Sequence, residues 1–322
     1  MSDANTHGPI EGKVIGHYFG VFHGCTLQHF QNIVAVAPFQ ICNLLILAFI
    51  GITQRADGAW VPVLPNGRDN CFNGGRAKDS DTDDYRIKHV VKTARAANHG
   101  IKILISFGYC NEVAKAATSP EAFAKGLADI VQKYGLDGFD IDWEGRLDVE
   151  DFTSAKFVTF MDYVTNALSK VVTRPILTIC PAFLFGQNDP LRDQKVLSKF
   201  TYVLPQTYDH GGDGTRADDY AVLLGGYDKI VYGINGEGYV VPPAWDSKQV
   251  PDDPGVSWQK MTQNNAAGVF LWRIDTDSMP EATAHECNDA RCKAGECDLE
   301  GDLQLPTCAV AEEIWQLKLG HY

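Results

Sequence analysis

The sequence predicts an α/β protein built as one closed (β/α)8 barrel, and three observations lead to this prediction. Eight short runs rich in β-branched and aromatic residues follow one another, separated by segments with helical periodicity. These runs are apolar almost throughout, as are strands of a parallel sheet that is covered on both faces. The chain has 322 residues, and such a barrel typically needs about 250. We expect a single domain over residues 1–322.

The expected strands coincide with the apolar runs and lie at 14–19, 44–50, 101–107, 138–143, 176–181, 202–207, 229–234 and 269–274. Helices are expected before the third and fifth strands, at Asp83–Asn98 and Asp151–Val172. A last helix is expected to run to Leu319, with Thr307 as its N-cap.

The helix between the third and fourth strands has clear ends in the sequence. Ser119 is a suitable N-cap, and Pro120 suits the first helical position. Gly135 is placed to end the helix in a left-handed conformation. The apolar residues between these ends recur at helical spacing and predict one face packed on the sheet.

Charge and hydropathy exclude two classes of partner. The 28 Lys and Arg residues against 41 Asp and Glu residues give a net charge of 28 − 41 = −13. Such a surface repels phosphate backbones, so we expect no nucleic-acid partner. The longest apolar stretch, at 33–52, contains Pro38, Gln40 and Asn43, whose polar groups would be buried in lipid if it crossed a membrane. We therefore expect no membrane segment, and a monomer.

The cysteines leave the compartment open. Cys287, Cys292, Cys297 and Cys308 lie in one polar segment at about 285–308, before the last helix. This density favours two disulfides over plain thiols, and over a zinc site, which would need a tighter Cys-x2-Cys spacing. The other cysteines in apolar runs are expected to be inert core thiols, at Cys42, Cys110 and Cys180. Secretion is expected if a signal peptide is missing from this sequence, and a cytoplasmic location otherwise.

The segment with the strongest indication of chemistry is the expected fourth strand. Because alternate side chains of a strand share a face, Asp140, Asp142 and Glu144 point into the barrel while the apolar residues between them face the helices. Close carboxylates resist ionising together, so one proton should be retained, and Glu144, nearest the mouth, is the natural acid. The alternatives are a solvated edge and an EF-hand calcium loop, in which Asp151 would replace the bidentate Glu.

Five motifs resemble those of glycoside hydrolase family 18, the family of chitinases and endo-β-N-acetylglucosaminidases, and they occur along the chain in the order expected of that family. Asp137–Glu144 is similar to the family signature Asp-Gly-x-Asp-x-Asp-x-Glu at all five fixed positions. Ala48–Phe49 resembles the end of the second strand, and Ser106–Tyr109 the Ser-x-Gly-Gly motif with Tyr in place of the last Gly. Gln206–Asp209 resembles the motif of the sixth strand. Trp272 matches the aromatic floor beneath the sugar.

The resemblance implies a retaining mechanism in which the substrate supplies the nucleophile. Glu144 would protonate the glycosidic oxygen and later activate water. Asp142 would hold the acetamido N–H, Asp140 would share a proton with Asp142, and Tyr208 would donate to the acetamido oxygen. No metal or organic cofactor is implied. Further substrate-binding residues implied by the resemblance are Trp272, Gln206, Asp209, Tyr18, Phe49 and Tyr109.

The expected function is that of an endochitinase, which cleaves β-1,4 linkages after N-acetylglucosamine in an oligo- or polysaccharide. About thirty residues separate the last two strands, too few for the insertion domain of many chitinases, so the groove should be open. The first alternative is an endo-β-N-acetylglucosaminidase that cuts the chitobiose core of N-glycans on glycoproteins. The second is a silent carbohydrate-binding or storage protein, disfavoured because Glu144, Asp142 and Tyr208 are all present.

Overall fold

The computed structural model describes residues 10–22, 27–64, 82–145, 147–148, 151–182, 189–208, 215–237, 252–278 and 305–320. The strands are β1 (Val14–Gly20), β2 (Leu44–Gln54), β3 (Trp60–Val63), β4 (Lys102–Gly108), β5 (Gly138–Trp143), β6 (Ile176–Pro181), β7 (Tyr202–Val203), β8 (Val231–Asn235) and β9 (Gly268–Trp272). The α-helices are α1 (Leu27–Val36), α2 (Asp83–Ala97), α3 (Cys110–Ala116), α4 (Pro120–Tyr134), α5 (Ser154–Leu168), α6 (Gln194–Leu197), α7 (Thr215–Leu224), α8 (Pro254–Gln263) and α10 (Ala309–Leu319). Within these ranges, no helix is both long enough and apolar enough to cross a bilayer.

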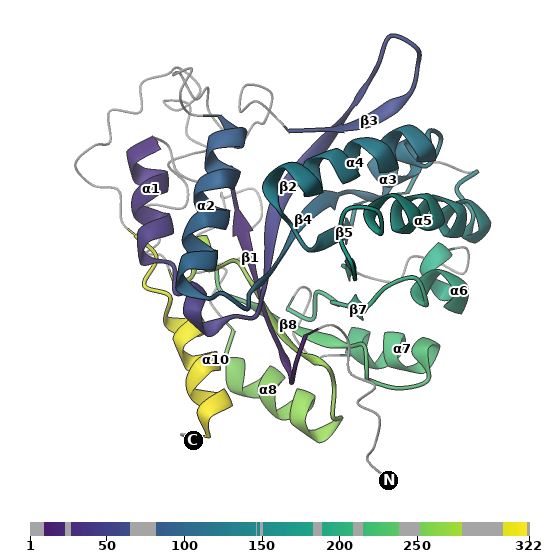
Figure 1. Ribbon diagram of the computed structural model, residues 1–322. Coiled ribbons are helices and arrows are strands. Elements are labelled where there is room, and N and C mark those ends of the chain that lie inside the picture. The colour runs from purple at the N-terminus through teal and green to yellow at the C-terminus, as the bar shows by residue number, and fades with distance from the viewer. Residues whose placement is uncertain are drawn as a thin grey trace, which may run out of the picture.

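The predicted (β/α)8 barrel is confirmed. Eight parallel strands pair in the order β7-β6-β5-β4-β2-β1-β9-β8, and the helices surround them (Figure 1). A parallel bridge between Val203 and Ile230 joins the two ends of this order and closes the barrel. The carboxyl ends of all eight strands therefore meet at one mouth, which is where barrel enzymes place their sites.

The strand β3 is an addition that the sequence analysis missed. It pairs antiparallel with an extension of β2, from Gly51↔Val63 to Gln54↔Trp60, and the hairpin projects beside α4 (Figure 1). The run Trp60–Val63 is short and follows the turn residues Asp57 and Gly58. It also contains Pro62, a residue that argues against a strand in a sequence pattern. Of the predicted strands, β5 and β6 have the expected bounds, whereas β7 ends at Val203 instead of Thr207.

The apolar residues form an inner and an outer cluster. Inside the barrel lie side chains such as Val14, Ile46 and Phe270. The larger cluster fills the layer between strands and helices and includes Phe139 and Trp143 of β5. The expected alternation along β5 is thus confirmed, because its apolar side chains pack outward on the helices and leave its acids facing inward.

Two strands begin at a glycine because their neighbours lie too close for any side chain. A Cβ on Gly138 would lie 1.9 Å from the carbonyl oxygen of Ile176, and a Cβ on Gly268 would lie 2.0 Å from that of Val14. Both distances are far below contact between non-bonded atoms. Glycine at these positions lets β5 and β9 pack against the next strand.

Helix ends follow the prediction in part. Gly135 ends α4 in the left-handed region (φ 63°), as predicted, but the Ser119 side chain makes no capping hydrogen bond. The N-cap of α10 is Cys308 and not Thr307. The Asp277 carboxylate caps α10 from a distance, since it accepts from the backbone N–H groups of Val310 (3.2 Å) and Ala311 (2.8 Å).

The prediction that Cys308 forms one of two disulfides is wrong. This cysteine is a free, buried thiol, packed between α10 and the end of the barrel. The other three members of the predicted group, Cys287, Cys292 and Cys297, lie outside the described residues. Three further predictions are confirmed, because Cys42, Cys110 and Cys180 are also buried free thiols. Burial raises the pKa of the Cys42 thiol to about 12, so it stays protonated and inert.

Candidate active site

Three acidic side chains occupy β5 and the residue after it. Asp140 is fully buried, Asp142 is 5% exposed, and Glu144 is half-buried, just past the last strand residue, Trp143. Exposure thus increases toward the mouth of the barrel. Of the three carboxyl groups, that of Glu144 is the one best placed to meet a ligand entering from solvent.

Asp140 is held by hydroxyl groups from three other strands. Its Oδ2 accepts from Ser106 Oγ (2.6 Å) and from the Tyr18 hydroxyl (3.0 Å), and its Oδ1 accepts from Thr178 Oγ1 (2.5 Å). Burial raises the pKa of Asp140, and the three hydroxyl donors oppose that rise because they favour the ionised carboxylate. Thr178 was missed in the sequence, where a Thr in a buried strand carries no distinguishing signal.

Gln206 joins the two outer carboxylates. Its Nε2 donates to Asp142 Oδ1 (3.0 Å) and to Glu144 Oε2 (3.3 Å). The backbone is fixed as well, because the Tyr109 N–H donates to the Asp142 carbonyl (3.0 Å) and the Cys110 N–H to the Glu144 carbonyl (2.9 Å). Gln206 was predicted to contact the sugar; its amide group lies on the two carboxylates, where it orients both.

Aromatic rings line the neighbouring strand ends β1, β2 and β9. The ring centroid of Trp272 lies 5.2 Å from that of Tyr18 and 6.1 Å from that of Phe49. Phe49 lies 6.2 Å from Phe22, with the two ring planes 9° apart. Phe22, Phe49 and Trp272 are half-buried, whereas Tyr18 is fully buried and its hydroxyl is engaged with Asp140. Phe22 was not singled out in the sequence, since it lies just past the expected end of its strand.

Tyr208 lies beyond the end of β7, where it contacts β8 and β9. Its ring meets Phe270 edge-on, with 6.0 Å between centroids. Gly233 of β8 makes room for it, because a Cβ there would lie 2.9 Å from the Tyr208 ring. The preceding residue, Thr207, fixes the same spot, since its hydroxyl pairs with both the N–H and the carbonyl of Gly233 at 2.8 Å. Asp209, also predicted to bind the sugar, lies outside the described residues.

A comparison of the sequence with protein families gives a match to a family of glycosidases. Residues 15–235 match Glycosyl hydrolases family 18, and this range holds the strands from β1 through β8 and the whole acidic row. The chain belongs to glycosyl hydrolases family 18. The barrel is therefore a glycosidase domain.

Two curated relatives of this chain are chitinases by name. An endochitinase of Brugia malayi is 26% identical over 231 residues, covering 68% of this chain and 43% of that protein. Chitinase B of Serratia marcescens is 24% identical over 244 residues, covering 66% of this chain and 45% of that protein. This chain thus spans less than half the length of these curated relatives. The solved class V chitinase of Nicotiana tobaccum shares the fold, with a TM-score of 0.58 at 13% identity over 88% of this chain and 98% of that one.

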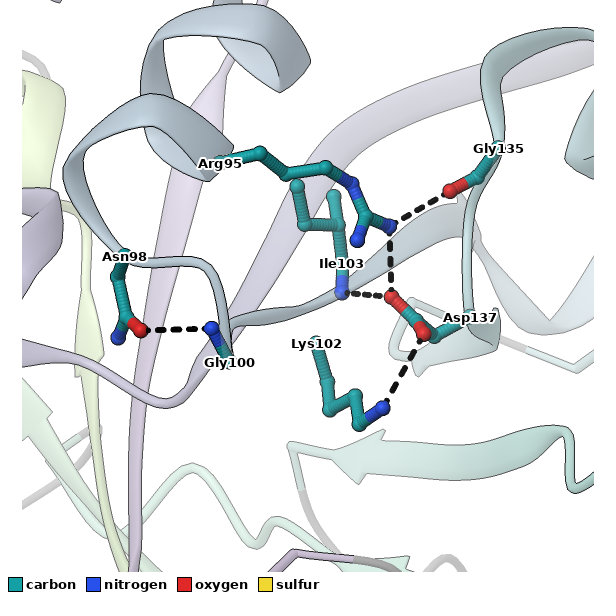
Figure 2. Close-up of polar contacts among 7 residues, drawn as sticks. All are labelled: Arg95, Asn98, Gly100, Lys102, Ile103, Gly135 and Asp137. Atoms are coloured by element: carbon teal, nitrogen blue, oxygen red, sulfur yellow. Dashed lines mark hydrogen bonds and ion pairs between the residues drawn. The ribbon is translucent and has the colours of Figure 1, made fainter.

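The first residue of the family-18 signature lies at the opposite end of the barrel from the acids. Asp137 precedes β5, and its Oδ2 accepts from the Ile103 N–H (2.9 Å) and from Arg95 (2.9 Å), while Lys102 lies 3.5 Å from Oδ1 (Figure 2). Arg95 also donates to the Gly135 carbonyl at 2.6 Å (Figure 2). Asp137 thus joins α2, β4 and the entry to β5, and its contribution is to the fold rather than to the chemistry.

Tyr109 replaces the last glycine of the family motif and, among the described residues, is an exposed aromatic residue near the acids. Its side chain is 52% exposed, and its backbone has a positive φ of 66°, unusual for a residue with a Cβ. Gly145, next to Glu144, leaves room for the ring, since a Cβ there would lie 3.2 Å from it. Tyr109 therefore lies beside Gly145 at the end of β4, and its binding of the substrate stays a prediction.

The calcium-loop alternative does not fit the structure. Asp140 and Asp142 belong to a regular strand paired on both sides, whereas an EF-hand loop needs a tight turn in which successive acids converge on one point. Asp140 also uses both oxygens to accept from hydroxyl groups. In the part of the chain that is described, no three His, Cys, Asp or Glu side chains gather in a way suited to a metal ion.

Proposed function

We propose that this family-18 barrel is an endochitinase, which hydrolyses β-1,4 linkages after N-acetylglucosamine with retention of configuration. The observation that carries the proposal is the graded row of acids with the Gln206 amide between its two outer members. A group that both protonates a leaving oxygen and later activates water must reach the substrate. Glu144 is the least buried member of the row.

The surroundings of the row support a substrate-assisted mechanism. Glu144 donates a proton to the glycosidic oxygen, and the 2-acetamido carbonyl oxygen of the substrate attacks the anomeric carbon. Asp142, oriented by Gln206, receives the acetamido N–H as positive charge develops. Tyr208 donates its hydroxyl to the acetamido oxygen and so fixes its line of approach. Water then opens the oxazolinium-type intermediate, with Glu144 as the base.

The hydroxyl cage around Asp140 gives this carboxylate a supporting role. Burial raises the pKa of Asp140, and the three hydroxyl hydrogens that its oxygens accept oppose this rise because they favour the ionised form. A negative Asp140 next to Asp142 on the same strand face favours a proton on Asp142 or a proton shared between the two. Proton sharing of this kind would let Asp142 change its orientation during the reaction.

The choice of chitin rests on the relatives, and the short connection between β8 and β9 supports endo-cleavage. The Brugia malayi relative is named an endochitinase, and another solved form of the tobacco class V chitinase, a mutant, is described as a complex with NAG4. Only residues 236–267 connect β8 to β9, so this side of the mouth has little chain to wall off a polymer. In this proposal residues 1–322 act as one catalytic barrel and as a monomer.

The proposal is tested with a fluorogenic chitooligosaccharide and with two matched variants. Glu144→Gln should lower kcat by about 10²–10⁴, the usual effect of losing a general acid. Glu112→Gln on α3 makes the same chemical change at a half-buried glutamate outside the row and should keep kcat. Equal activity of Glu144→Gln and the wild type would refute the assignment.

Mechanism and substrate are separated by three further measurements. The first product anomer, followed by NMR during cleavage of chitohexaose, should be β if configuration is retained, and a thiazoline mimic of the intermediate should inhibit competitively. An endo-acting enzyme releases internal fragments of several lengths from chitohexaose. Cleavage of a glycosylated protein with no cleavage of chitin oligomers would instead show an N-glycan-specific endo-β-N-acetylglucosaminidase. Binding of the oligomers with no cleavage of either substrate would show the silent binding protein.

A further inference from the structure

A buried arginine follows Trp272 directly. Arg273 is 7% exposed, and a buried charge is costly unless it is paired. Two carboxylates pair with it: Glu237 Oε1 lies 3.4 Å from Nε, and Asp275 Oδ2 lies 3.3 Å from Nη2. These two acids are themselves 6% and 0% exposed. The three charges therefore form one buried group at the ends of β8 and β9.

The two carboxylates are held in place by the strand ends around them. Asp275 Oδ1 accepts from the Gly20 N–H of β1 (2.8 Å), and Glu237 Oε1 accepts from the Thr276 hydroxyl (3.3 Å). A Cβ on Gly20 would lie 3.0 Å from Asp275 Oδ2 and 3.1 Å from Arg273 Nη1. The missing side chain at Gly20 thus lets the guanidinium and the carboxylate meet under the end of β1.

The guanidinium carbon of Arg273 also lies over two of the aromatic rings of the site. It is 4.8 Å from the ring centroid of Phe22 and 5.6 Å from that of Trp272. Phe49 joins these rings, at 6.2 Å from Phe22 and 6.1 Å from Trp272. We call the half-buried rings of Phe22, Phe49 and Trp272 the aromatic wall. Its two outer rings contact the same buried cation.

We infer that Arg273 is a positioning residue which fixes the aromatic wall, so that the wall binds the sugars of the substrate on the Trp272 side of Glu144. This inference rests on the proposed function and extends it to a residue that touches no substrate. Arg273 contributes to the binding of an oligosaccharide and leaves the protonation step at Glu144 unchanged. Its charge is already neutralised by Glu237 and Asp275, so it does not select an anionic sugar.

Arginine suits this position because its planar guanidinium can lie on rings while its edge donates to carboxylates. Lysine keeps the charge but presents a point ammonium group that cannot do both. Arg273→Lys therefore releases the rings while leaving the buried acids with a cation. A substitution that removes the positive charge of Arg273 would leave two buried carboxylates unpaired and could unfold the protein. A loss of binding in such a variant could not be told apart from a loss of folding.

The test compares Arg273→Lys with Arg95→Lys, the same change in an ion-paired arginine at the opposite end of the barrel. KM for chitotetraose should rise about tenfold in Arg273→Lys, with kcat within about twofold of the wild type. In the Glu144→Gln background, the Kd for chitotetraose measured by calorimetry should rise by the same factor. Arg95→Lys should change neither quantity. Glu237→Gln, which keeps Arg273 and removes one of its partners, should weaken binding in the same direction by a smaller factor.

The inference is overturned if KM and Kd of Arg273→Lys match the wild type, if both arginine variants shift them equally, or if kcat falls while KM stays constant. Should Arg273→Lys not fold, as judged by circular dichroism, unchanged affinity of Glu237→Gln overturns the inference alone. Failure of the proposed function looks different, since the wild type itself would then fail to cleave chitotetraose.

Discussion

Replacement of Thr178 by Val removes one hydroxyl donor from Asp140 with almost no change in shape. Thr178 and Asp140 are both fully buried, and the hydrogen bond between them is 2.5 Å long. A hydrogen bond to a charged group contributes about 1.5–3 kcal/mol, and one to a neutral group about 0.5–1.5 kcal/mol. The cost of the substitution must therefore depend on whether Asp140 carries a charge.

The sign of that dependence follows from the pKa of Asp140. Burial raises this pKa in the folded state above the ordinary value of 3.8, so the charged form costs stability as pH rises through the folded pKa. Loss of the Thr178 donor raises the folded pKa further, because the ionised carboxylate loses one of its hydrogen bonds. The destabilisation by Thr178→Val should therefore be smallest where Asp140 is protonated and should grow as rising pH ionises it, toward about 1.5–3 kcal/mol for the ionised carboxylate.

Urea unfolding of the wild type, Thr178→Val and Thr178→Ser at pH 4, 5.5 and 7.5 measures this difference. Thr178→Ser keeps the hydroxyl group and should restore most of the stability at every pH, apart from a small loss for the missing methyl group. A destabilisation that is constant across these pH values, or that is larger at pH 4, would contradict the view that Asp140 is an ionised carboxylate stabilised by hydroxyl donors. Equal stability of the Val and Ser variants would contradict it as well.

Three further predictions concern the framework of the barrel. His17→Leu should raise the free energy of unfolding at pH 8 by about 1–3 kcal/mol, because neither ring nitrogen of this buried His has a hydrogen-bond partner among the described residues. Burial lowers the pKa of His17 from 6.5 to about 3, so the wild type loses stability as pH falls below 6.5. In urea titrations the gain in stability from His17→Leu should therefore be larger at pH 5 than at pH 8. An equal gain at the two pH values would contradict this. Gly138→Ala forces a Cβ to within 1.9 Å of the Ile176 carbonyl and should cost more than about 4 kcal/mol; a Tm within about 3 °C of the wild type would refute this close approach. Asp137→Asn keeps an acceptor for the Ile103 N–H but loses the charge facing Arg95 and Lys102. The free energy of unfolding should fall by about 1 kcal/mol, with kcat and KM unchanged. Loss of activity in this variant would contradict the purely structural role of Asp137.

Much of the barrel was predictable because its signals are local. The bounds of β5 and β6 follow from short apolar runs between turn residues, and the inward direction of Asp140 and Asp142 follows from the alternation of a strand. The end of α4 follows from a glycine free to adopt a positive φ. The hairpin of β3 did not emerge in this way, because Pro62 hides a strand that pairs on one side only.

The chain by itself determined the order of strands and helices, the row of acids and the family signature, since each depends on residues a few positions apart. The tertiary structure alone decided which distant side chains meet: Gln206 with Asp142 and Glu144, Thr178 with Asp140, and Arg273 with Glu237 and the aromatic wall. The physical reason is that such pairs depend on the register between strands and on the closure of the barrel. A one-residue shift of register would turn each inward side chain outward, and no local pattern of polar and apolar residues records which partner an inward side chain will face.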